Sequence, residues 1–459
     1  MGGSPASPSL PPLRTSTGLP VRGSAREISN RVVLTAPAPG GGLYVVIHGR
    51  TGPALLTLLD STGRPQAGWP VLLVGATACE QLLPVADGSA RVLCGLDNPD
   101  GNPRPALAFA FDSSGRSVAG WPVDLRASSL MDGPDRSASG RVVGDELTLF
   151  TGVIEADTAP ATFVGALVTV ASDGALRVGD RVTMGYSCCD HVLGIGPDGV
   201  GYDVDPGAAS ANGTDTPSAI TASDLSGVRA GWPVSIDGIA SAPAFGPRGR
   251  IVLTVASSVR RTSRVLVFDR EGEAVSAGSA ELPIATVDEN TGETGGCGVG
   301  SPQAPLVAHD GTIFVYSEID TEIQALDPSL GIMSGWPFEL ATPLVRARPG
   351  YDSEHEAGYC PSPVVPAVGP DSTLYLPLQA RDASVGGSIV AVGPDGRVRP
   401  GWPVELKRPG AEFWSVVVGI DGTIYALAIE PEAGDTSSAS ILAIAPDSTV
   451  RWTTTIIEP

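Results

Sequence analysis

A pentapeptide built around Gly-Trp-Pro occurs five times in this 459-residue chain, and it limits the available folds more than any other feature. It reads AGWPV at 67–71, with close copies at 119–123, 230–234, 334–338 and 400–404. Two of the four gaps between copies are about twice as long as the others, which predicts one degenerate copy in each. Asp180 and Ser279 take the tryptophan position there, and Trp452 takes it in a final copy. Eight copies at a period of about 55 residues indicate a repeat architecture.

Each repeat contains four short runs of β-branched and aromatic residues bounded by turns of the Asp-Gly type. The 58 glycines and 42 prolines suit many short strands joined by turns, and no run has a sustained helical period. The sequence therefore predicts an all-β, eight-bladed β-propeller with four antiparallel strands in each blade. The blades are expected at about 31–73, 79–125, 139–184, 188–236, 239–282, 297–340, 360–406 and 413–456.

The domain organisation follows from these units. Residues 1–25 are expected to form a flexible leader or tether rich in proline and serine, and residues 26–459 a single propeller domain. The segment STGLPVRG at 16–23 resembles a worn copy of the last strand of a repeat, so it is a candidate to close the ring on the final blade. The strand of Trp452 competes for the same place.

The pentapeptide is expected in the outermost strand of each blade. Its glycine permits a bulge or a close approach of the backbone, and its indole can pack as an apolar wedge between neighbouring blades. Its proline lacks an N–H, which discourages pairing at an exposed sheet edge. Display as a binding motif is the alternative. Six of the seven tryptophans share this structural position: Trp69, Trp121, Trp232, Trp336, Trp402 and Trp452.

The repeats resemble those of eight-bladed quinoprotein-type propellers, from about residue 26 to the end. The matching features are DGTIF at 310–314, DGTIY at 421–425 and the tryptophan of the last strand. The resemblance implies a fold shared by dehydrogenases and non-catalytic lipoprotein scaffolds, and the scaffold branch is the expectation here. The GWP spelling is also similar to integrin-like FG-GAP repeats, which carry a calcium loop, but turns such as AHDGTI at 308–313 lack its additional carboxylates.

The long connections fall on one face of the predicted propeller. Turns between the first and second and between the third and fourth strands share the lower face, and the sequence keeps these short. The upper face receives the long connections: 97–105, 126–138, 154–163, 203–218, 283–303, 341–362, 380–388 and 429–440. Binding residues commonly lie on loops that a rigid scaffold positions. We therefore expect function at the upper face.

The charge of −21 argues against a nucleic-acid partner. It favours a protein partner or another basic ligand. The upper connections are mostly acidic, interrupted by Arg346 and Arg348. The acidic residues are Asp97, Asp100, Asp203, Asp205, Asp288, Glu289, Glu293, Asp352, Glu354 and Glu356. No cofactor is expected; calcium is the open alternative, with LDNPDGNP at 96–103 the best candidate loop.

Two sequence clusters and one tryptophan are the candidate binding residues of the upper face. CCDH at 188–191 and DSEHEAGYC at 352–360 each hold a histidine, so a joint metal site is one hypothesis. Adjacent residues of a strand point to opposite sides, so CCDH cannot turn all its ligands to one ion. Trp414 is expected near the channel mouth. The candidate residues are Asp190, His191, Asp352, Glu354, His355, Tyr359 and Trp414.

Six cysteines in a chain expected to be exported suggest three disulfides. Cys79 begins a strand and Cys94 lies on its hairpin partner, near enough to bridge. Cys297 and Cys360 enter consecutive blades at similar positions. Cys188 and Cys189 are adjacent, and quinoprotein dehydrogenases carry such a pair near their cofactor, which is the point of similarity to the catalytic branch.

No stretch is long and apolar enough to span a bilayer, and the sequence shows no nucleophile elbow, phosphate loop or HExxH pattern. We expect an exported protein, periplasmic, extracellular or at the cell surface, with a membrane link only through a lipid anchor. The predicted function is a non-catalytic binding or assembly scaffold. The alternatives are a quinone-dependent oxidoreductase and a calcium-dependent adhesion module.

Overall fold

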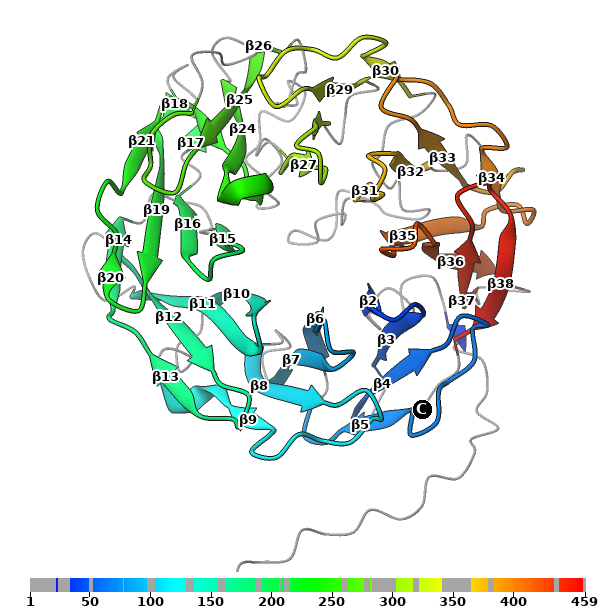
Figure 1. The fold of residues 1–459 in the computed structure, drawn as a ribbon, viewed down its shortest axis with the longest axis horizontal. Helices are drawn as coiled ribbons and strands as arrows, with labels where there is room; N and C mark the ends of the chain where they lie inside the picture. Colours follow the sequence, from blue (N-terminus) through cyan, green and yellow to red (C-terminus); the bar gives the residue numbers. More distant parts are fainter. Residues whose placement is uncertain are drawn as a thin grey trace, which may run out of the picture.

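A computed structural model gives the fold, an eight-bladed β-propeller whose blades follow one another around a central axis (Figure 1). This confirms the predicted fold class. The structure describes residues 22–23, 34–48, 53–76, 78–96, 104–128, 136–155, 162–185, 192–205, 208–209, 215–257, 262–275, 281–282, 303–316, 322–340, 365–378, 384–432 and 437–456.

The first four blades each contain four antiparallel strand positions. Blade 1 consists of β2 (Leu34–Pro37), β3 (Leu43–Ile47), β4 (Ala54–Leu59) and β5 (Val71–Leu73). Blade 2 consists of β6 (Ala78–Pro84), β7 (Ala90–Leu96), β8 (Arg104–Phe111) and β9 (Val123–Asp124). Blade 3 consists of β10 (Arg136–Val143), β11 (Glu146–Glu155), β12 (Thr162–Val170) and a divided outer strand, β13 (Leu176–Val178) and β14 (Val182–Gly185). Blade 4 consists of β15 (Val192–Ile195), β16 (Gly201–Asp205), β19 (Ser218–Asp224), β20 (Gly227–Val228) and β21 (Val234–Ile236), with a small hairpin of β17 (Ala208–Ala209) and β18 (Asp215–Thr216).

The second four blades repeat this order. Blade 5 consists of β22 (Ile239–Ala240) and β23 (Ala244–Phe245), which both pair with β24 (Ile251–Ser257), then β25 (Thr262–Phe268) and β26 (Glu281–Leu282). Blade 6 consists of β27 (Leu306–Val307), β28 (Ile313–Val315), β29 (Glu322–Leu326) and β30 (Phe338–Glu339). Blade 7 consists of β31 (Ala367–Val368), β32 (Leu374–Leu378), β33 (Ser388–Val392) and β34 (Val404–Glu405). Blade 8 consists of β35 (Glu412–Val418), β36 (Ile424–Pro431), β37 (Ser437–Ile444) and β38 (Val450–Thr455).

Helical structure within the described residues is limited to two 3₁₀ turns, η1 (Leu125–Ser128) and η2 (Pro247–Gly249). No helix in that part of the chain has the length and apolar character needed to cross a membrane.

The hydrophobic core lies between blades. The second strands are apolar on both sides: every residue of β3, LYVVI, is buried, and so is every residue of β32, LYLPL. Such strands read as continuous apolar runs because both sheet faces are covered by neighbouring blades. One cluster joins blades 1 and 2, another joins blades 7 and 8, and a third joins blade 8 to blade 1. Each blade is therefore stabilised by both of its neighbours.

The pentapeptide interrupts the outer strand, which pairs with β4 at Pro65 before it and again from Val71, the last residue of the pentapeptide. Strand β5 begins at Val71, so Gly68 and Trp69 belong to the preceding turn. Gly68 has a φ of 90°, and a Cβ there would lie 2.0 Å from the Ser114 carbonyl oxygen, so the backbones of blades 1 and 2 meet where only glycine fits. All five Trp-Pro peptide bonds are cis.

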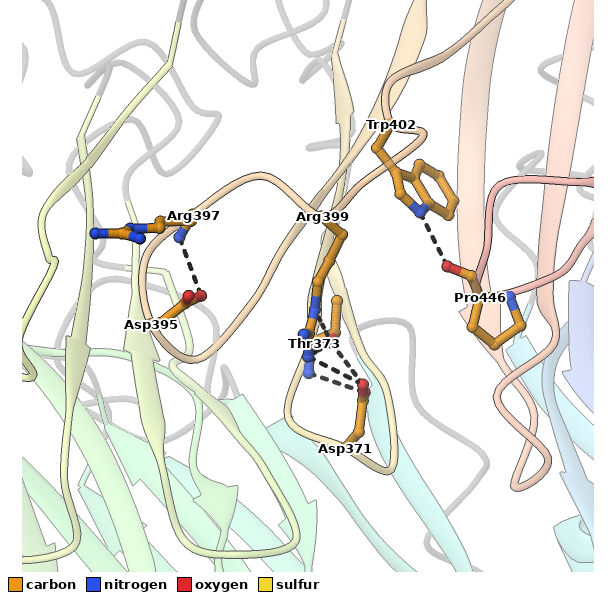
Figure 2. Close-up of polar contacts among 7 residues, drawn as sticks. All are labelled: Asp371, Thr373, Asp395, Arg397, Arg399, Trp402 and Pro446. Carbon is orange, nitrogen blue, oxygen red and sulfur yellow. Dashed lines mark hydrogen bonds and ion pairs between the residues drawn. The ribbon is translucent and has the colours of Figure 1, made fainter.

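Each of the five Trp-Pro tryptophans links its blade to the next one. The Trp402 indole Nε1–H donates to the Pro446 carbonyl, 3.1 Å away in the turn before β38 (Figure 2). The other four indoles make the same bond: Trp69 to Ser113, Trp121 to Ser172, Trp232 to Arg270 and Trp336 to Pro394. Each acceptor stands two residues before a residue with left-handed backbone, such as Gly115 or Ser448. We call this carbonyl the junction carbonyl.

Three junctions differ from this pattern, and the one between blades 5 and 6 is described with its pocket below. Between blades 3 and 4, Asp180 stands in the tryptophan position, and its main-chain N–H donates to the junction carbonyl of Leu225 at 3.0 Å. Between blades 8 and 1, Trp452 lies against the turn of Gly63, and the Thr454 hydroxyl donates to the Gly63 carbonyl at 2.7 Å. The closing junction is therefore bonded, although with other groups.

Two segments share one edge at the closing blade. Strand β38 pairs with β37 from Ser440 to Ile444, and β1 (Arg22–Gly23) pairs with the same edge of β37 at Ser437 and Ser438. Residues 16–21 of the proposed closing segment lie outside the described residues. The N- and C-terminal segments thus occupy consecutive stretches of this edge.

Candidate functional site

The upper edge of the inner strands in blades 8, 1 and 2 brings polar and aromatic side chains together. Strands β35, β2 and β6 are the innermost strands of these three consecutive blades (Figure 1). Trp414 and Glu80 lie near the upper starts of β35 and β6, and His48 directly follows the upper end of β3. We call His48, Cys79, Glu80, Cys94 and Trp414 the upper rim.

Cys79 and Cys94 form the fixed part of the upper rim. They are direct partners across β6 and β7, and their sulfur atoms lie at a disulfide distance of 2.03 Å. Both cysteines are buried. This is the pair that hairpin proximity suggested; Cys188, Cys189, Cys297 and Cys360 lie outside the described residues.

His48 is a buried structural acceptor. Its side chain is 4% exposed, and its Nε2 accepts the main-chain N–H of Cys79 at 2.8 Å. Burial lowers the pKa of His48 to about 4, so the imidazole is neutral near pH 7. Because Nε2 accepts a hydrogen bond, the ring proton lies on Nδ1. Nε2 is occupied by the backbone and cannot take a proton from a substrate without breaking this bond.

Glu80 is the carboxyl of the upper rim. The pairing of β6 with β7 shifts between Cys79 and Gln81, so Glu80 is the extra residue of a β-bulge. Burial raises the pKa of Glu80 to about 7. Near neutral pH this carboxyl therefore exists in both forms and can either donate or accept a hydrogen bond. Gln81 fixes the next position by bonding blade 3: its Oε1 accepts from Gly140 N–H at 2.8 Å.

Trp414 occupies a similar bulge in blade 8. The pairing of β35 with β36 shifts between Phe413 and Ser415, which leaves Trp414 as the extra residue. Its half-buried ring packs against the cluster that joins blades 8 and 1, which includes Ile47 and Ile429. Bulges often re-aim a side chain at a functional site. The bulge thus places the Trp414 ring at the contact between blades 8 and 1.

Trp414 is the one predicted upper-face binding residue that the structure describes. Asp190, His191, Asp352, Glu354, His355 and Tyr359 lie outside the described residues, as does the candidate calcium loop from Asp97 to Pro103. Among the residues that are described, no group of three or more His, Cys, Asp or Glu side chains is arranged to hold a metal ion. The upper rim contains one titratable carboxyl, Glu80, and one half-buried aromatic ring, Trp414.

Two expectations need correction or addition. Asp203 was expected in a solvated acidic loop, but it lies within β16 and is 1% exposed, because β16 continues to Asp205 before the connection begins. Sequence reasoning also missed Glu80 and His48. A carboxylate between Cys79 and Gln81 in an inner strand was the available signal for Glu80, but the bulge that buries it depends on the pairing register.

The fold and upper rim define a closed propeller scaffold with a half-buried aromatic and carboxyl site. Among solved structures, the chain is similar to streptogramin B lyase (11% identity, 77% of this chain and 92% of that chain, TM-score 0.40). It is also similar to a putative 6-phosphogluconolactonase from Bacteroides uniformis (13%, 81% and 97%, TM-score 0.44). A third is a quinoprotein alcohol dehydrogenase-like protein from Bacteroides thetaiotaomicron (12%, 91% and 82%, TM-score 0.40).

Likenesses at these values carry no information on activity or ligand. No protein-family model matches the chain, and a search of curated proteins also found no match.

Proposed function

We propose that this protein is an exported, non-catalytic binding scaffold whose upper face holds a partner protein or another basic ligand. The observation that carries the proposal is the difference between the two faces of the ring. The lower face consists of short turns with internal hydrogen bonds, and the long acidic connections join strands at the upper face.

The lower turns are locked by aspartate side chains. In most of them, an Asp Oδ1 accepts a main-chain N–H two residues later, as Asp395 accepts from Arg397 (Figure 2). The same bond is made by Asp60, Asp87, Asp112, Asp173, Asp198, Asp224, Asp269, Asp310, Asp327, Asp371, Asp421 and Asp447. One oxygen of each of these carboxylates is held by its own turn, so the lower turns are fixed in shape.

Side-chain ion pairs add to these turns in the last two blades. Arg399 donates to Asp371 and Thr373, and Arg451 donates to the Thr423 hydroxyl beside Asp421 (Figure 2 shows the first set). Together with the interblade tryptophan bonds, they favour a ring that changes shape little when a partner binds. A preorganised surface loses less conformational entropy on association.

The upper connections supply the charge for recognition. The charge of −21 steers basic partners toward the protein. The connection from residue 341 to 366 contains Asp352, Glu354 and Glu356, and the connection from 283 to 305 contains Asp288 and Glu289. The upper rim lies on the same side, so a partner held by these loops would meet Glu80 and Trp414.

The test compares three baits in chemical cross-linking to an extract of the native source. The wild type is compared with an upper variant (Asp352→Asn, Glu354→Gln, Glu356→Gln) and with a lower variant of equal charge change (Asp145→Asn, Glu271→Gln, Glu273→Gln), whose three residues are exposed in lower turns. We expect partners captured by the wild type and the lower variant to be lost by the upper variant. Equal capture by all three baits, or loss by the lower variant alone, would contradict the proposal.

The two alternatives rest on residues outside the described part of the chain. The quinone-dependent oxidoreductase depends on Cys188 and Cys189, and the calcium-dependent adhesion module on the loop at 96–103. Absorbance of a bound quinone in protein from the native source would favour the first. An increase in thermal stability with calcium would favour the second.

A further inference from the structure

A pocket of about 250 Å³ opens on the lower face between blades 5 and 6, away from the upper rim. Its floor is apolar and includes Val252, Val267, Val307 and Ile313. Its rim is formed by the turn around η2 in blade 5 and by the turn at His309 and Asp310 in blade 6. Both turns join first to second strands, which places the pocket on the face opposite the long acidic connections.

The pocket coincides with the junction at which a serine takes the tryptophan position. Ser279, outside the described residues, is the blade 5 counterpart of Trp232 and Trp336 in the sequence. The junction carbonyl of blade 6 belongs to Pro328, two residues before Leu330, whose φ is 68°. It accepts from Arg250 Nη1 at 3.3 Å. An arginine of the inner turn therefore supplies the bond that an indole supplies at five other junctions.

The rim of the pocket is cationic in a strongly acidic protein. Arg248 and Arg250 both line it, and neither forms an ion pair with a carboxylate within the described residues. Arg250 uses one of its five N–H groups on Pro328. Asp310 is the acidic member, and its Oδ1 already accepts the Thr312 N–H at 2.9 Å. Partial burial opposes ionisation of Asp310, but hydrogen bonds from Thr312 and Ser372 outweigh it and hold its pKa below the usual value.

The backbone places Arg248 on this rim at a conformational cost. Arg248 has a φ of 64°, a region that glycine occupies freely and other residues seldom do. Four non-glycine residues in the described part of the chain have such a φ, and two of them belong to this junction: Arg248 on the rim and Leu330 in the apolar cluster beneath it. Backbone outliers of this kind concentrate at functional sites.

We propose that this pocket binds a small organic monoanion with an apolar body, such as an aryl or branched alkyl carboxylate. The carboxylate pairs with Arg248 and Arg250, since a guanidinium matches a carboxylate with two parallel hydrogen bonds. The apolar body lies on the valine and isoleucine floor. A cavity of about 150 Å³ holds benzene, so this pocket has room for a ring and a carboxylate, about ten non-hydrogen atoms.

The test uses phenylacetate and its neutral isostere phenylacetamide, titrated into the full-length protein by ligand-detected NMR and calorimetry. We expect saturable phenylacetate binding in the millimolar range or tighter, as ligand efficiency allows for a molecule of this size. Phenylacetamide should bind at least about tenfold more weakly, because it leaves the guanidinium charges without a counterion. Acetate, which keeps the charge and lacks the ring, should also bind more weakly.

Variants locate the site. Arg248→Gly removes one cation and suits the left-handed backbone, so the fold should be retained. Arg250→Gln removes the other and keeps an N–H for Pro328. Each should weaken phenylacetate binding by about tenfold, the effect of losing one charge-assisted bond. Arg116→Gln, on the lower face of blade 2, is the matched control and should bind as the wild type does. No saturable binding, equal binding of acid and amide, or unchanged affinity in both pocket variants would overturn the proposal.

Discussion

Replacing Glu80 with glutamine should change how the stability of the propeller depends on pH. The side chain of Glu80 lies at a bulge of the innermost strand of blade 2, where burial raises its pKa from the usual 4.5 to about 7. Glutamine has nearly the same shape and never ionises. The variant therefore removes the titration while it leaves the strand pairing intact.

The sign follows from proton binding in the two states. Below pH 4.5 the carboxyl is neutral in both the folded and the unfolded chain, so it contributes no pH dependence. Between pH 4.5 and about 7 the unfolded chain releases this proton and the folded chain keeps it. The free energy of unfolding of the wild type therefore falls as pH rises through this window. Above it, the cost of an ionised Glu80 stays constant.

The magnitude follows from the size of the shift. One pKa unit corresponds to about 1.4 kcal/mol, so the full shift of Glu80 would amount to about 3 kcal/mol. Because Glu80 is only half-buried, solvent screening reduces this to about 1–2 kcal/mol. Relative to the wild type, Glu80→Gln should thus gain about 1–2 kcal/mol of stability between about pH 4 and pH 8.

His48 provides the control with opposite sign. Burial lowers its pKa from 6.5 to about 4, so between these values the unfolded chain binds a proton that the folded chain does not. The free energy of unfolding falls as pH decreases through this window. His48→Gln keeps a side-chain acceptor for the Cys79 N–H and removes the titration. Relative to the wild type, it should become more stable as pH falls.

Urea unfolding of the wild type and both variants at a series of pH values measures these differences. Between about pH 4.5 and 6.5 the two groups change the stability of the wild type in opposite directions as pH changes. Relative to the wild type, Glu80→Gln should therefore become more stable as pH rises, and His48→Gln should become more stable as pH falls. A difference between Glu80→Gln and the wild type that is the same at low and high pH would refute the reasoning. So would a fall in the relative stability of Glu80→Gln with rising pH.

Three further predictions concern the ring itself. Trp402→Phe loses the hydrogen bond to Pro446, so in urea unfolding it should lower stability by about 1 kcal/mol more than Trp452→Phe. The Trp452 indole forms no hydrogen bond within the described residues. Equal losses of stability in the two variants would contradict this. Cys79→Ala should lower stability by about 2–3 kcal/mol, as expected for a separation of 15 residues, and the Cys79→Ala/Cys94→Ala double variant should lose no more than the single variant. Deletion of residues 1–23 removes, within the described part of the chain, the pairing at Ser437 and Ser438 and should cost at most about 1 kcal/mol. Deletion of residues 449–459 removes β38 and should abolish cooperative thermal unfolding.

The sequence was sufficient to predict the architecture because the repeat is visible even where it is degenerate. Asp180 and Ser279 could be placed in the tryptophan position by the strand pattern around them, and eight blades follow from eight copies. The hydrogen bond of the indole could not be predicted in the same way. Its acceptor is a main-chain carbonyl in the next repeat, and only the turn geometry shows which carbonyl faces the ring.

The upper rim was harder to predict for a related reason. Trp414 could be singled out because it lies outside the tryptophan position of the repeat. By contrast, the sequence around Glu80 does not show that the pairing of β6 with β7 shifts at this residue. A shift of one residue moves a side chain to the other face of its strand. Asp203 illustrates the same limit, since a strand that continues two residues further converts an expected loop carboxylate into a buried one.

At the junctions between blades, the hydrogen-bond acceptor is constant and the donor varies. At seven junctions the same turn carbonyl accepts a hydrogen bond, and three kinds of donor supply it: five indoles, the main-chain N–H of Asp180 and the guanidinium of Arg250. Because three different groups donate to this carbonyl, the bond between blades does not require tryptophan. Where Arg250 is the donor, it also brings a charge and further N–H groups to the rim of a pocket, which an indole does not. The junction between blades 5 and 6 thus combines a bonded junction carbonyl with the pocket that we propose binds a small organic monoanion.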